Sequence, residues 1–410
     1  MNTKHISIFS LPIIVAALGY FVDIYDLVLF GIFRKPSLQA IGLEGDLLES
    51  AGHTLINVQM IGMLVGGLFW GILGDKKGRL SVLFGSIITY SIANLLNAYV
   101  QTLPQYIIIR FVAGFGLAGE LGAGITLVSE LLKKEQRGWG TTFVATVGVS
   151  GAVFAGILGK YVDWKTGYII GGVLGFALLL LRIGVVESGI YKNAKEHSNN
   201  TLGSLKLIFQ NKTNFKTYMY CILSGLPVWY GVGILVFFSP ELGKELNIQG
   251  TIETPLAITY AYIGVTLGDL VSGMLSQIFK TRIKVMQWFI ASCFIFVIAY
   301  SFLNNASVAY LYFVCLMIGF TSGYWAVIIS TSAEQFGTNV RATVATSVPN
   351  FIRAALVPIT FLYSNIFHQF FGIGKINSAL ITGLICCSIA LWSVSQLKET
   401  FAKDLNYLEN

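Results

Sequence analysis

Two carboxylates stand three residues apart in an otherwise uncharged, apolar stretch near the start of the chain. Asp23 and Asp26 are the only charged residues of segment 10–33, and their spacing places both side chains on one side of a helix. Burial favours a protonated carboxylic acid and a nearby cation favours the charged form, so such a group can bind and release a proton when its partner changes. We therefore predict proton coupling here, with a static ion pair as the alternative. Which aspartate holds the proton stays open, because interacting carboxylates titrate together.

Three more ionisable side chains lie inside apolar segments. Glu120 follows Arg110 in the same segment, about 15 Å farther along a helix. It is either a second protonation or substrate site, or an ion-pair partner of Arg110 or of an aspartate. Arg353 lies near the middle of another segment that contains no acidic residue. Its guanidinium group predicts a site for an anionic substrate group such as carboxylate, with a pair to Asp269 as the alternative.

The composition requires that membrane-spanning elements position these groups. Of the 410 residues, 55% are hydrophobic and only 11% are charged, whereas soluble domains carry about 25% charged residues. About 20 apolar residues cross the hydrocarbon core, and a span must pair its own backbone polar groups, so each is a helix. We predict an all-α membrane protein with twelve transmembrane helices, at residues 10–33, 54–74, 81–100, 106–132, 139–158, 167–186, 217–239, 256–279, 285–303, 308–333, 342–367 and 377–397.

The distribution of basic residues sets the expected orientation. About two thirds of the 27 Lys and Arg residues fall in loops on one side of the predicted spans, and such an excess marks cytoplasmic loops. We therefore expect both termini in the cytoplasm and the protein in the inner (plasma) membrane of a bacterium. The longest polar stretch, residues 187–216, is predicted to link an N-terminal six-helix bundle (1–186) to a C-terminal one (217–410).

An internal repeat relates the two halves. Glu130 and Arg137 flank one loop, and Glu334 and Arg341 flank another loop 204 residues later. The segment that begins at Gly71 has a weaker echo 202 residues later. A duplicated half of about 200 residues explains both offsets, and parallel repeats of six helices are a known transporter architecture.

The loop at residues 71–79, GILGDKKGR, resembles the loop signature of the major facilitator superfamily, which is G, x, L, a small residue, D, a basic residue, x, G, R. The segment Arg110-x-x-x-Gly114-x-Gly116 is similar to the family's fourth-helix motif. The family's antiporters have a glycine–proline pair in the fifth helix. Segment 147–159 has glycines but no proline, which argues against antiport.

The first predicted helix is similar to the metabolite–proton symporter branch of that family. There the helix reads roughly G, three residues, E, W, Y, D, F, two residues, Y, G. In segment 19–31, Asp23 stands where the branch has Glu, and Tyr25 and Asp26 match directly. The departures are Ile24, Leu27 and Phe30. The chain is thus identified as a relative of this branch. The resemblance does not imply that it shares the substrate of the branch.

The resemblance implies roles for several residues. First and fourth helices line the family's cavity, so Arg110 is the expected partner of the aspartates and a substrate contact. The remaining cavity candidates are Tyr20, Trp229, Tyr230, Tyr324, Trp325, Asn350 and Arg353; packing or interface anchoring is the alternative for the aromatic residues, and helix–helix hydrogen bonding for the asparagine. The family's loop charges latch the two halves together in the outward-open state. The expected latch residues are Gly71, Asp75, Gly78, Arg79, Glu130, Arg137, Glu334 and Arg341. We expect Asp75 to meet the N-terminus of a helix in the other half, and a lopsided latch, because Gln277 replaces the aspartate in the second repeat.

These observations predict a secondary active transporter that takes up a small polar, anionic or zwitterionic metabolite together with protons, by alternating access. The alternative is an exporter of a siderophore or drug by proton antiport. We expect no cofactor beyond the proton gradient, no nucleic acid, and a monomer in contact with substrate, protons and lipid. An enzyme or a metal site is not expected, because the four histidines have no ligand spacing. A nucleotide-binding G-x-x-x-x-G-K-[ST] loop is absent from the sequence, and the repeat with deep charges fits alternating access better than a channel.

Overall fold

The computed structural model describes residues 7–184 and 208–402. Within them, twelve helical spans are long and apolar enough to cross a membrane. No strand occurs among the described residues, where the extended segments form only one isolated bridge, between Gln249 and Ser307. The predicted all-α architecture with twelve spans is confirmed.

The first six spans are built from seven α-helices. They are α1 (Leu11–Ala40), α2 (Gly45–Lys77), α3 (Arg79–Asn97), α4 (Leu103–Leu117), α5 (Glu120–Leu131), α6 (Lys134–Leu158) and α7 (Trp164–Leu181). Helices α4 and α5 together form one span. A short 3-10 turn, η1 (Arg182–Gly184), follows α7.

The second half of the described chain contains more breaks. Its elements are α10 (Lys212–Leu223), α11 (Leu226–Tyr230), η2 (Gly231–Val236), α12 (Ser239–Glu245), α13 (Thr254–Ile278), α14 (Ile283–Ser301), α15 (Val308–Ser322), α16 (Trp325–Gln335), α17 (Arg341–Ala354), α18 (Leu356–Phe361), η3 (Leu362–Phe370) and α19 (Lys375–Gln396), of which α12 lies between two spans. The segments η2 and η3 are π-helical. Most of the predicted linker 187–216 lies outside the described residues, and its last residues belong to α10, which begins at Lys212.

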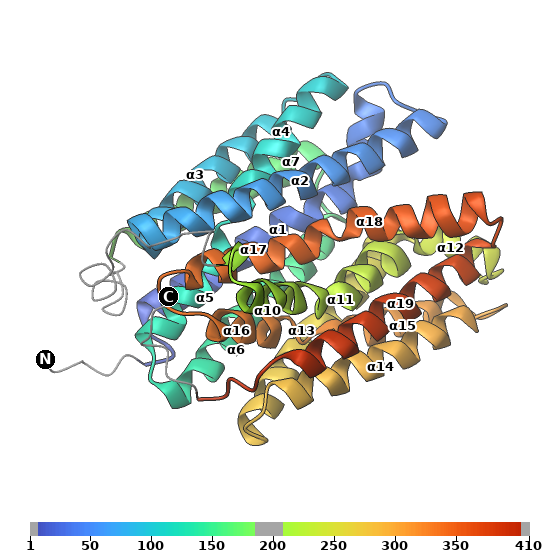
Figure 1. Ribbon diagram of the computed structural model, residues 1–410. Helices are drawn as coiled ribbons and strands as arrows, with labels where there is room; N and C mark the ends of the chain where they lie inside the picture. Colours follow the sequence, from blue (N-terminus) through green and yellow to red (C-terminus); the bar gives the residue numbers. More distant parts are fainter. Residues whose placement is uncertain (1–6, 185–207, 403–410) are drawn as a thin grey trace, which may run out of the picture.

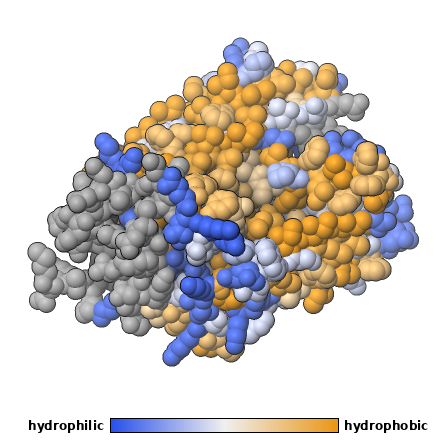
Figure 2. All heavy atoms as spheres, in the orientation of Figure 1, coloured by the Kyte–Doolittle hydropathy of each residue, from blue (hydrophilic) through white to orange (hydrophobic). Residues whose placement is uncertain are grey.

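Apolar side chains cover the outside of the helices. Figure 2 shows a broad hydrophobic face, with hydrophilic residues gathered mainly toward the ends of the bundle. Large apolar side chains are exposed along many helices, among them Ile108 (64%), Ile295 (63%) and Trp392 (54%). In water such a surface is costly, so the described surface suits the hydrocarbon core of a membrane.

Glycines set the close packing within each half. Gly62 and Gly66 of α2 lie against backbone carbonyl groups of α4, where a side chain would collide. Gly264 and Gly268 of α13 lie in the same way against α15. Gly264 and Gly268 follow Gly62 and Gly66 by 202 residues, the offset found in the sequence, so the same helix contact is built twice.

In Figure 1, α2, α3 and α4 of the first half lie above and α14, α15 and α19 of the second half below, while α5 and α6 lie beside α16 and α17. We call the end that holds the α2–α3 and α16–α17 connections the terminal end, because the described chain also begins and finishes there. At that end α2 packs against α17 and α6 against α13. Toward the opposite end the halves separate, and this asymmetry places the cavities described next.

Candidate functional site

Three cavities follow one another along the interface between the halves. A wide cavity of about 730 Å³ lies at the opposite end, between α2 and the α18–η3 segment. A narrow gap of about 10 Å³ beside Gln59 and Trp229 comes next. The innermost cavity has about 30 Å³, room for only a few water molecules. The pathway is therefore open at the opposite end and almost closed in the middle.

Aromatic residues from both halves form the walls of the innermost cavity. Tyr20 comes from α1, Trp229 from α11 and Trp325 from α16, and Arg353 of α17 completes this wall. The structure thus brings together four of the predicted cavity residues. Tyr262 of α13 also lines the cavity; no sequence signal distinguished it from the other eighteen tyrosines.

Arg353 pairs with Asp23 across the interface between the halves. Its Nη2 atom lies 3.7 Å from Oδ2 of Asp23, and both side chains are at most 1% exposed. Neither oxygen of Asp23 accepts a hydrogen bond within the described residues. Arg353 also donates to Oδ1 of Asn350 at 3.2 Å, and its guanidinium carbon lies 5.8 Å from the centre of the Trp325 ring. The ion pair is therefore close but not locked by hydrogen bonds.

The alternative partner of Arg353 is not used. Asp269 instead accepts a hydrogen bond from the backbone N–H of Ala326 at 3.0 Å, at the start of α16. A carboxylate at a helix N-terminus is stabilised by the unpaired N–H groups and the helix dipole. Asp269 therefore has a structural partner that the sequence did not reveal.

The predicted contact between the aspartates and Arg110 is not formed. Arg110 donates to Gln59, and its guanidinium group lies over the rings of Phe30 and Tyr168, 4.9 and 5.9 Å from their centres. Oδ1 of Asp26 lies against Gly171 of α7, beside the amide group of Asn94. Arg110 therefore contacts Gln59 and the two aromatic rings in place of the predicted aspartates.

Glu120 is an ion-pair partner rather than a cavity residue, and its partner is Arg182. The two side chains form hydrogen bonds of 2.9 and 2.6 Å, and Ser86 donates to Glu120 at 2.8 Å. Glu120 lines none of the three cavities. The prediction of a pair with Arg110 or an aspartate is wrong, because the end of α7 brings Arg182 closer.

Two predicted cavity tyrosines point into the second half. The hydroxyl group of Tyr230 donates to the carbonyl of Ala379 at 2.6 Å, and that of Tyr324 donates to the carbonyl of Ser224 at 3.0 Å. Both side chains are buried and line none of the three cavities. Asn350 joins the halves, because its amide donates to the carbonyl of Ala118 at 2.9 Å.

At the terminal end, Asp75 of α2 caps α17 in the other half. It accepts hydrogen bonds from the N–H groups of Ala342 and Thr343, at 3.1 and 2.8 Å, and from the Thr343 hydroxyl group at 2.7 Å. Gly71 lies against the backbone of Thr343, which allows this approach. Gly78 has a φ of 98°, which favours glycine, and it separates α2 from α3. The contact predicted for Asp75 is present.

Two arginines share Glu130 beside this cap. Nη2 of Arg79 donates to Glu130 at 2.8 Å, and Arg79 lies 3.6 Å from Asp75. Arg341 of the second half lies 3.7 Å from the same Glu130 oxygen. Glu130 therefore links charges from both halves at the terminal end.

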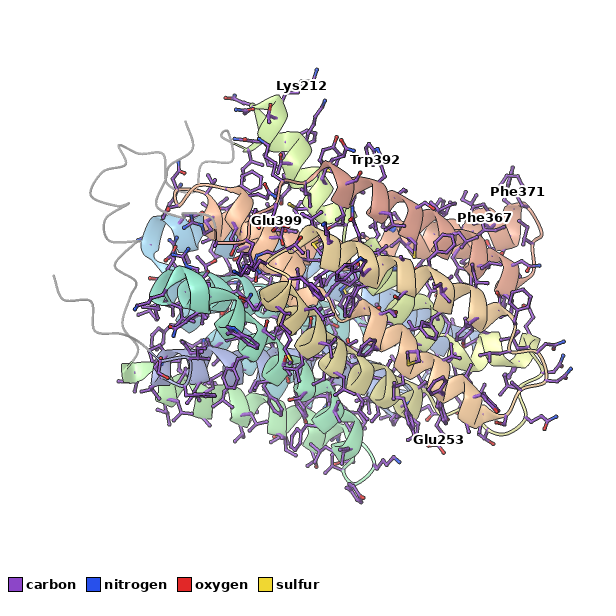
Figure 3. The ribbon with its side chains drawn as sticks, turned by 90° about the horizontal axis from the view of Figure 1, so that it is seen from below. Lys212, Glu253, Phe367, Phe371, Trp392 and Glu399 are labelled. Carbon is purple, nitrogen blue, oxygen red and sulfur yellow. The ribbon has the colours of Figure 1, made fainter. Side chains whose placement is uncertain are left out.

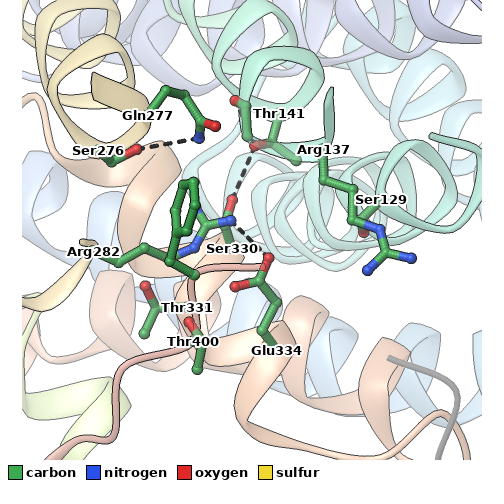
Figure 4. Close-up of polar contacts among 12 residues, drawn as sticks. Ser129, Arg137, Thr141, Ser276, Gln277, Arg282, Ser330, Thr331, Glu334 and Thr400 are labelled. Carbon is green, nitrogen blue, oxygen red and sulfur yellow. Dashed lines mark hydrogen bonds and ion pairs between the residues drawn. The ribbon is translucent and has the colours of Figure 1, made fainter. Parts of the chain in front are cut away.

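The second repeat builds a related arginine–glutamate pair, but its contacts with the first half are made by uncharged side chains (Figure 4). Arg282 donates to Glu334 at 2.7 Å, as Arg79 does to Glu130. The hydroxyl groups of Ser330 and Thr141 meet across the halves at 3.1 Å. Gln277 lies against Gly138 near the start of α6, where the repeat would place an aspartate. The latch is therefore lopsided. Arg282 also belongs to it, and its position in the second repeat, related to that of Arg79 in the first, could have identified it from the sequence.

The described end of the chain also docks at the terminal end, where Figure 3 labels Glu399. Glu399 accepts hydrogen bonds from the Thr281 hydroxyl group at 2.6 Å and from the N–H of Arg282 at 3.0 Å. Partial burial raises the pKa of the Glu399 carboxyl group, but these hydrogen bonds outweigh burial and hold the pKa below its ordinary value. The tail thus fixes the α13–α14 connection.

Comparisons with known proteins agree with this architecture. Residues 6–359 match the model of the Major Facilitator Superfamily. A Haemophilus influenzae protein whose name assigns it to metabolite transport is 26% identical over 83% of this chain and 84% of its own. The benzoate transport protein of Acinetobacter baylyi is 23% identical (81% and 78% covered), and the cis,cis-muconate transport protein of the same organism is 24% identical (84% and 85%).

A solved structure shows the same fold. The proton:xylose symporter XylE superposes with a TM-score of 0.78 at 16% identity, over 97% of this chain and 98% of XylE. The family match covers most of the sequence and the relatives are transporters of small molecules. The chain therefore belongs to the Major Facilitator Superfamily, and it is a multi-pass membrane transporter rather than an enzyme.

Proposed function

We propose that this protein imports a small organic carboxylate together with a proton. The observation that supports the proposal is the ion pair between Asp23 and Arg353, which joins the two halves beside the innermost cavity. A substrate carboxylate can offer Arg353 two parallel hydrogen bonds, whereas Asp23 offers a contact of 3.7 Å without one. The substrate therefore competes well for the arginine.

Release of Asp23 links the substrate to the proton. Once the substrate occupies Arg353, Asp23 is a buried carboxylate without a cation, and protonation removes the cost of its charge. Each ligand then favours binding of the other, as symport requires. The loaded site also carries less unpaired charge, which eases closure around it inside the membrane.

The aromatic side chains that line the innermost cavity support the proposal of a flat, unsaturated substrate. Tyr20, Trp229 and Trp325 surround the arginine, and flat rings pack well against such faces. The relatives named for benzoate and cis,cis-muconate transport act on carboxylates of this kind. A cavity of about 30 Å³ has to widen before such a molecule enters, so we place substrate binding in a more open conformation.

The distribution of charge supports import into the cytoplasm. The basic loops predict that the terminal end faces the cytoplasm of a bacterial inner membrane. With that orientation, the wide cavity of about 730 Å³ opens outward, and the Asp75 and Glu130 contacts close the inner end. Substrate arriving from outside meets an open entrance.

Transport in proteoliposomes tests the proposal. Labelled benzoate and cis,cis-muconate should accumulate when the outside is acidified, and unlabelled xylose should not compete. Asp23→Asn should abolish this accumulation but retain counterflow, which needs no net proton movement. Arg353→Lys should raise the KM at least about tenfold, because an ammonium group cannot form the two-pronged contact.

Asp269→Asn is the matched control, since its amide oxygen can still accept the N–H of Ala326. It should retain gradient-driven accumulation. Uptake of every carboxylate without any response to the proton gradient would reject coupling. Substrate efflux driven by an inward proton gradient would instead support the antiport alternative.

A further inference from the structure

We infer that the preferred substrate is a linear dicarboxylate, whose second carboxylate binds Arg110 in the place of Gln59. We call this second anchoring point the Arg110 site and define it by Arg110, Gln59, Phe30 and Tyr168. The inference rests on the proposed function and deepens it, because it adds an anion site to the one at Arg353 and so narrows the class of substrate.

Arg110 is a buried cation whose hydrogen-bonding capacity is mostly unused. Its side chain is 0% exposed, and a guanidinium group has five N–H donors. Nη2 donates to Gln59, whereas Nε and Nη1 have no hydrogen-bond partner among the described residues. No carboxylate in the described part of the chain forms an ion pair with it. A charge buried in this way is costly, and inside a membrane it marks a functional site.

Gln59 takes the place of an anion only in part. Its amide oxygen accepts one hydrogen bond from Arg110, but its amide nitrogen has no partner in the described chain. A carboxylate offers the same guanidinium group two oxygens and a negative charge. The rings of Phe30 and Tyr168, whose centres lie 4.9 and 5.9 Å from the guanidinium carbon, hold the cation in position. The site is therefore preformed for a carboxylate, which can displace the neutral amide.

The Arg110 site adjoins the substrate pathway. Phe30 and Gln59, which both contact the guanidinium group, line the narrow gap of about 10 Å³. Trp229 and Tyr262 line both this gap and the innermost cavity of about 30 Å³. Movement of these two side chains therefore joins the two spaces into one elongated cavity. Trp229 lies near the end of α11, which continues into the π-helical segment η2, and such breaks are frequent at functional sites.

Helix α1 sets the separation of the two arginines. Asp23, which pairs with Arg353, and Phe30, which lies under Arg110, are seven residues apart on α1, about 10 Å along the axis. An extended chain of six carbon atoms covers about 6 Å, and a charge-assisted hydrogen bond adds about 3 Å at each end. A six-carbon dicarboxylate therefore reaches both guanidinium groups.

The second arginine selects by charge. A dicarboxylate that fills the elongated cavity gives each buried guanidinium group its own carboxylate. An apolar group in the same place would displace Gln59 and leave Arg110 without any hydrogen-bond acceptor. A site built to hydrogen-bond a substrate group rejects an analogue that lacks this group, so a monocarboxylate of the same length should bind more weakly.

A matched pair of ligands tests the site. trans,trans-Muconate and sorbate share one six-carbon diene, and sorbate has a methyl group in place of the second carboxylate. Calorimetric titration of the purified protein in detergent measures both Kd values. Muconate should bind the wild-type protein at least about tenfold more tightly than sorbate. Gln59→Glu keeps the size of the side chain and places a carboxylate beside Arg110, so the ratio of the two Kd values should fall below about three.

Gln105→Glu is the matched control. It makes the same change on the same helix as Arg110, at an exposed position where the side-chain oxygen accepts the N–H of Gln101 at 3.1 Å. This variant should keep the wild-type ratio, because the added charge lies outside the cavities. Arg110→Gln should lower the ratio below about three, and it decides the question if Gln59→Glu fails to fold.

The outcomes separate this inference from the proposed function. Equal Kd values of muconate and sorbate for the wild-type protein would overturn the Arg110 site, and so would a wild-type ratio in Gln59→Glu or Arg110→Gln. If benzoate still accumulated with protons in proteoliposomes, carboxylate import would stand and only the second anchoring point would be lost. If neither acid bound and no carboxylate accumulated, both proposals would fail.

Discussion

The pair between Glu120 and Arg182 shows how a single buried charge is held in the first half. Both side chains are about 1% exposed, and Ser86 and the carbonyl of Leu83 supply further hydrogen bonds. Such a pair is stable because each charge compensates the other. Removing one partner leaves an unpaired charge in a low-dielectric interior.

We predict that Glu120→Gln lowers the free energy of unfolding by about 3–5 kcal/mol, the usual cost of breaking a buried ion pair. Thermal unfolding of the purified protein in detergent measures the change. The double variant Glu120→Leu with Arg182→Met should recover most of the stability, because no charge remains unpaired. A double variant as unstable as Glu120→Gln would show that the pair itself is not the source of the loss.

The types and depth of the membrane-buried charged residues were readable from the sequence, but the partners of these residues were not. Asp23, Arg110 and Arg353 were all identified as deep ionisable groups, and the structure buries each of them. Asp23 and Arg353 are 330 residues apart, and their contact depends on the rotation of α1 and α17 about their own axes. A turn of either helix by one residue would place a different side chain at the interface, and hydropathy does not determine that turn.

Helix ends, rather than side-chain pairs alone, close the terminal end. Asp75 caps the N-terminus of α17 through two N–H groups, and the N-terminus carries partial positive charge. Gln277 meets the start of α6 at the related position of the second repeat, but its amide is neutral. The first contact should therefore hold the closed conformation more strongly than the second.

We predict that Asp75→Asn shifts the equilibrium toward opening of the terminal end by about 1–2 kcal/mol, the value of a charge at a partly buried helix terminus. Labelling of Ser330→Cys with a thiol reagent measures opening, because Ser330 is buried between the halves in the closed form. Asp75→Asn should increase the labelling rate about fivefold or more. Gln277→Leu, the matched change in the other repeat, should have a smaller effect; an equal effect would contradict the asymmetry.

The sequence predicted the spans better than the breaks inside them. Apolar length located all twelve spans, and the 204-residue offset predicted that Glu130 and Glu334 lie at one end, where the structure pairs each with an arginine. The interruptions at Gly119 and Gly323 were not predicted. Average hydropathy is unchanged by a local turn, so a break in a helix that stays buried leaves no signal in composition.

At the scale of the whole molecule, a wide cavity separates the halves at one end and polar contacts join them at the other. The opposite end holds a cavity of about 730 Å³ lined by side chains such as Asn57 and Thr360. At the terminal end, the Asp75 cap and the Glu130 contacts join the halves. We propose that the two halves move as rigid bodies, so that rocking that closes one end opens the other.

We predict that single cysteines at the two ends respond in opposite directions to substrate. Asn57→Cys lines the wide cavity and should react with a membrane-impermeant thiol reagent, whereas Ser330→Cys should be protected. The five natural cysteines are buried, so their background labelling should be low. Benzoate added at acidic external pH should slow labelling of Asn57→Cys and speed labelling of Ser330→Cys, because substrate and proton together favour the inward-open form. If both rates rose together, the halves would be separating or unfolding rather than rocking, and if only one changed, the two ends would not be coupled through rigid halves.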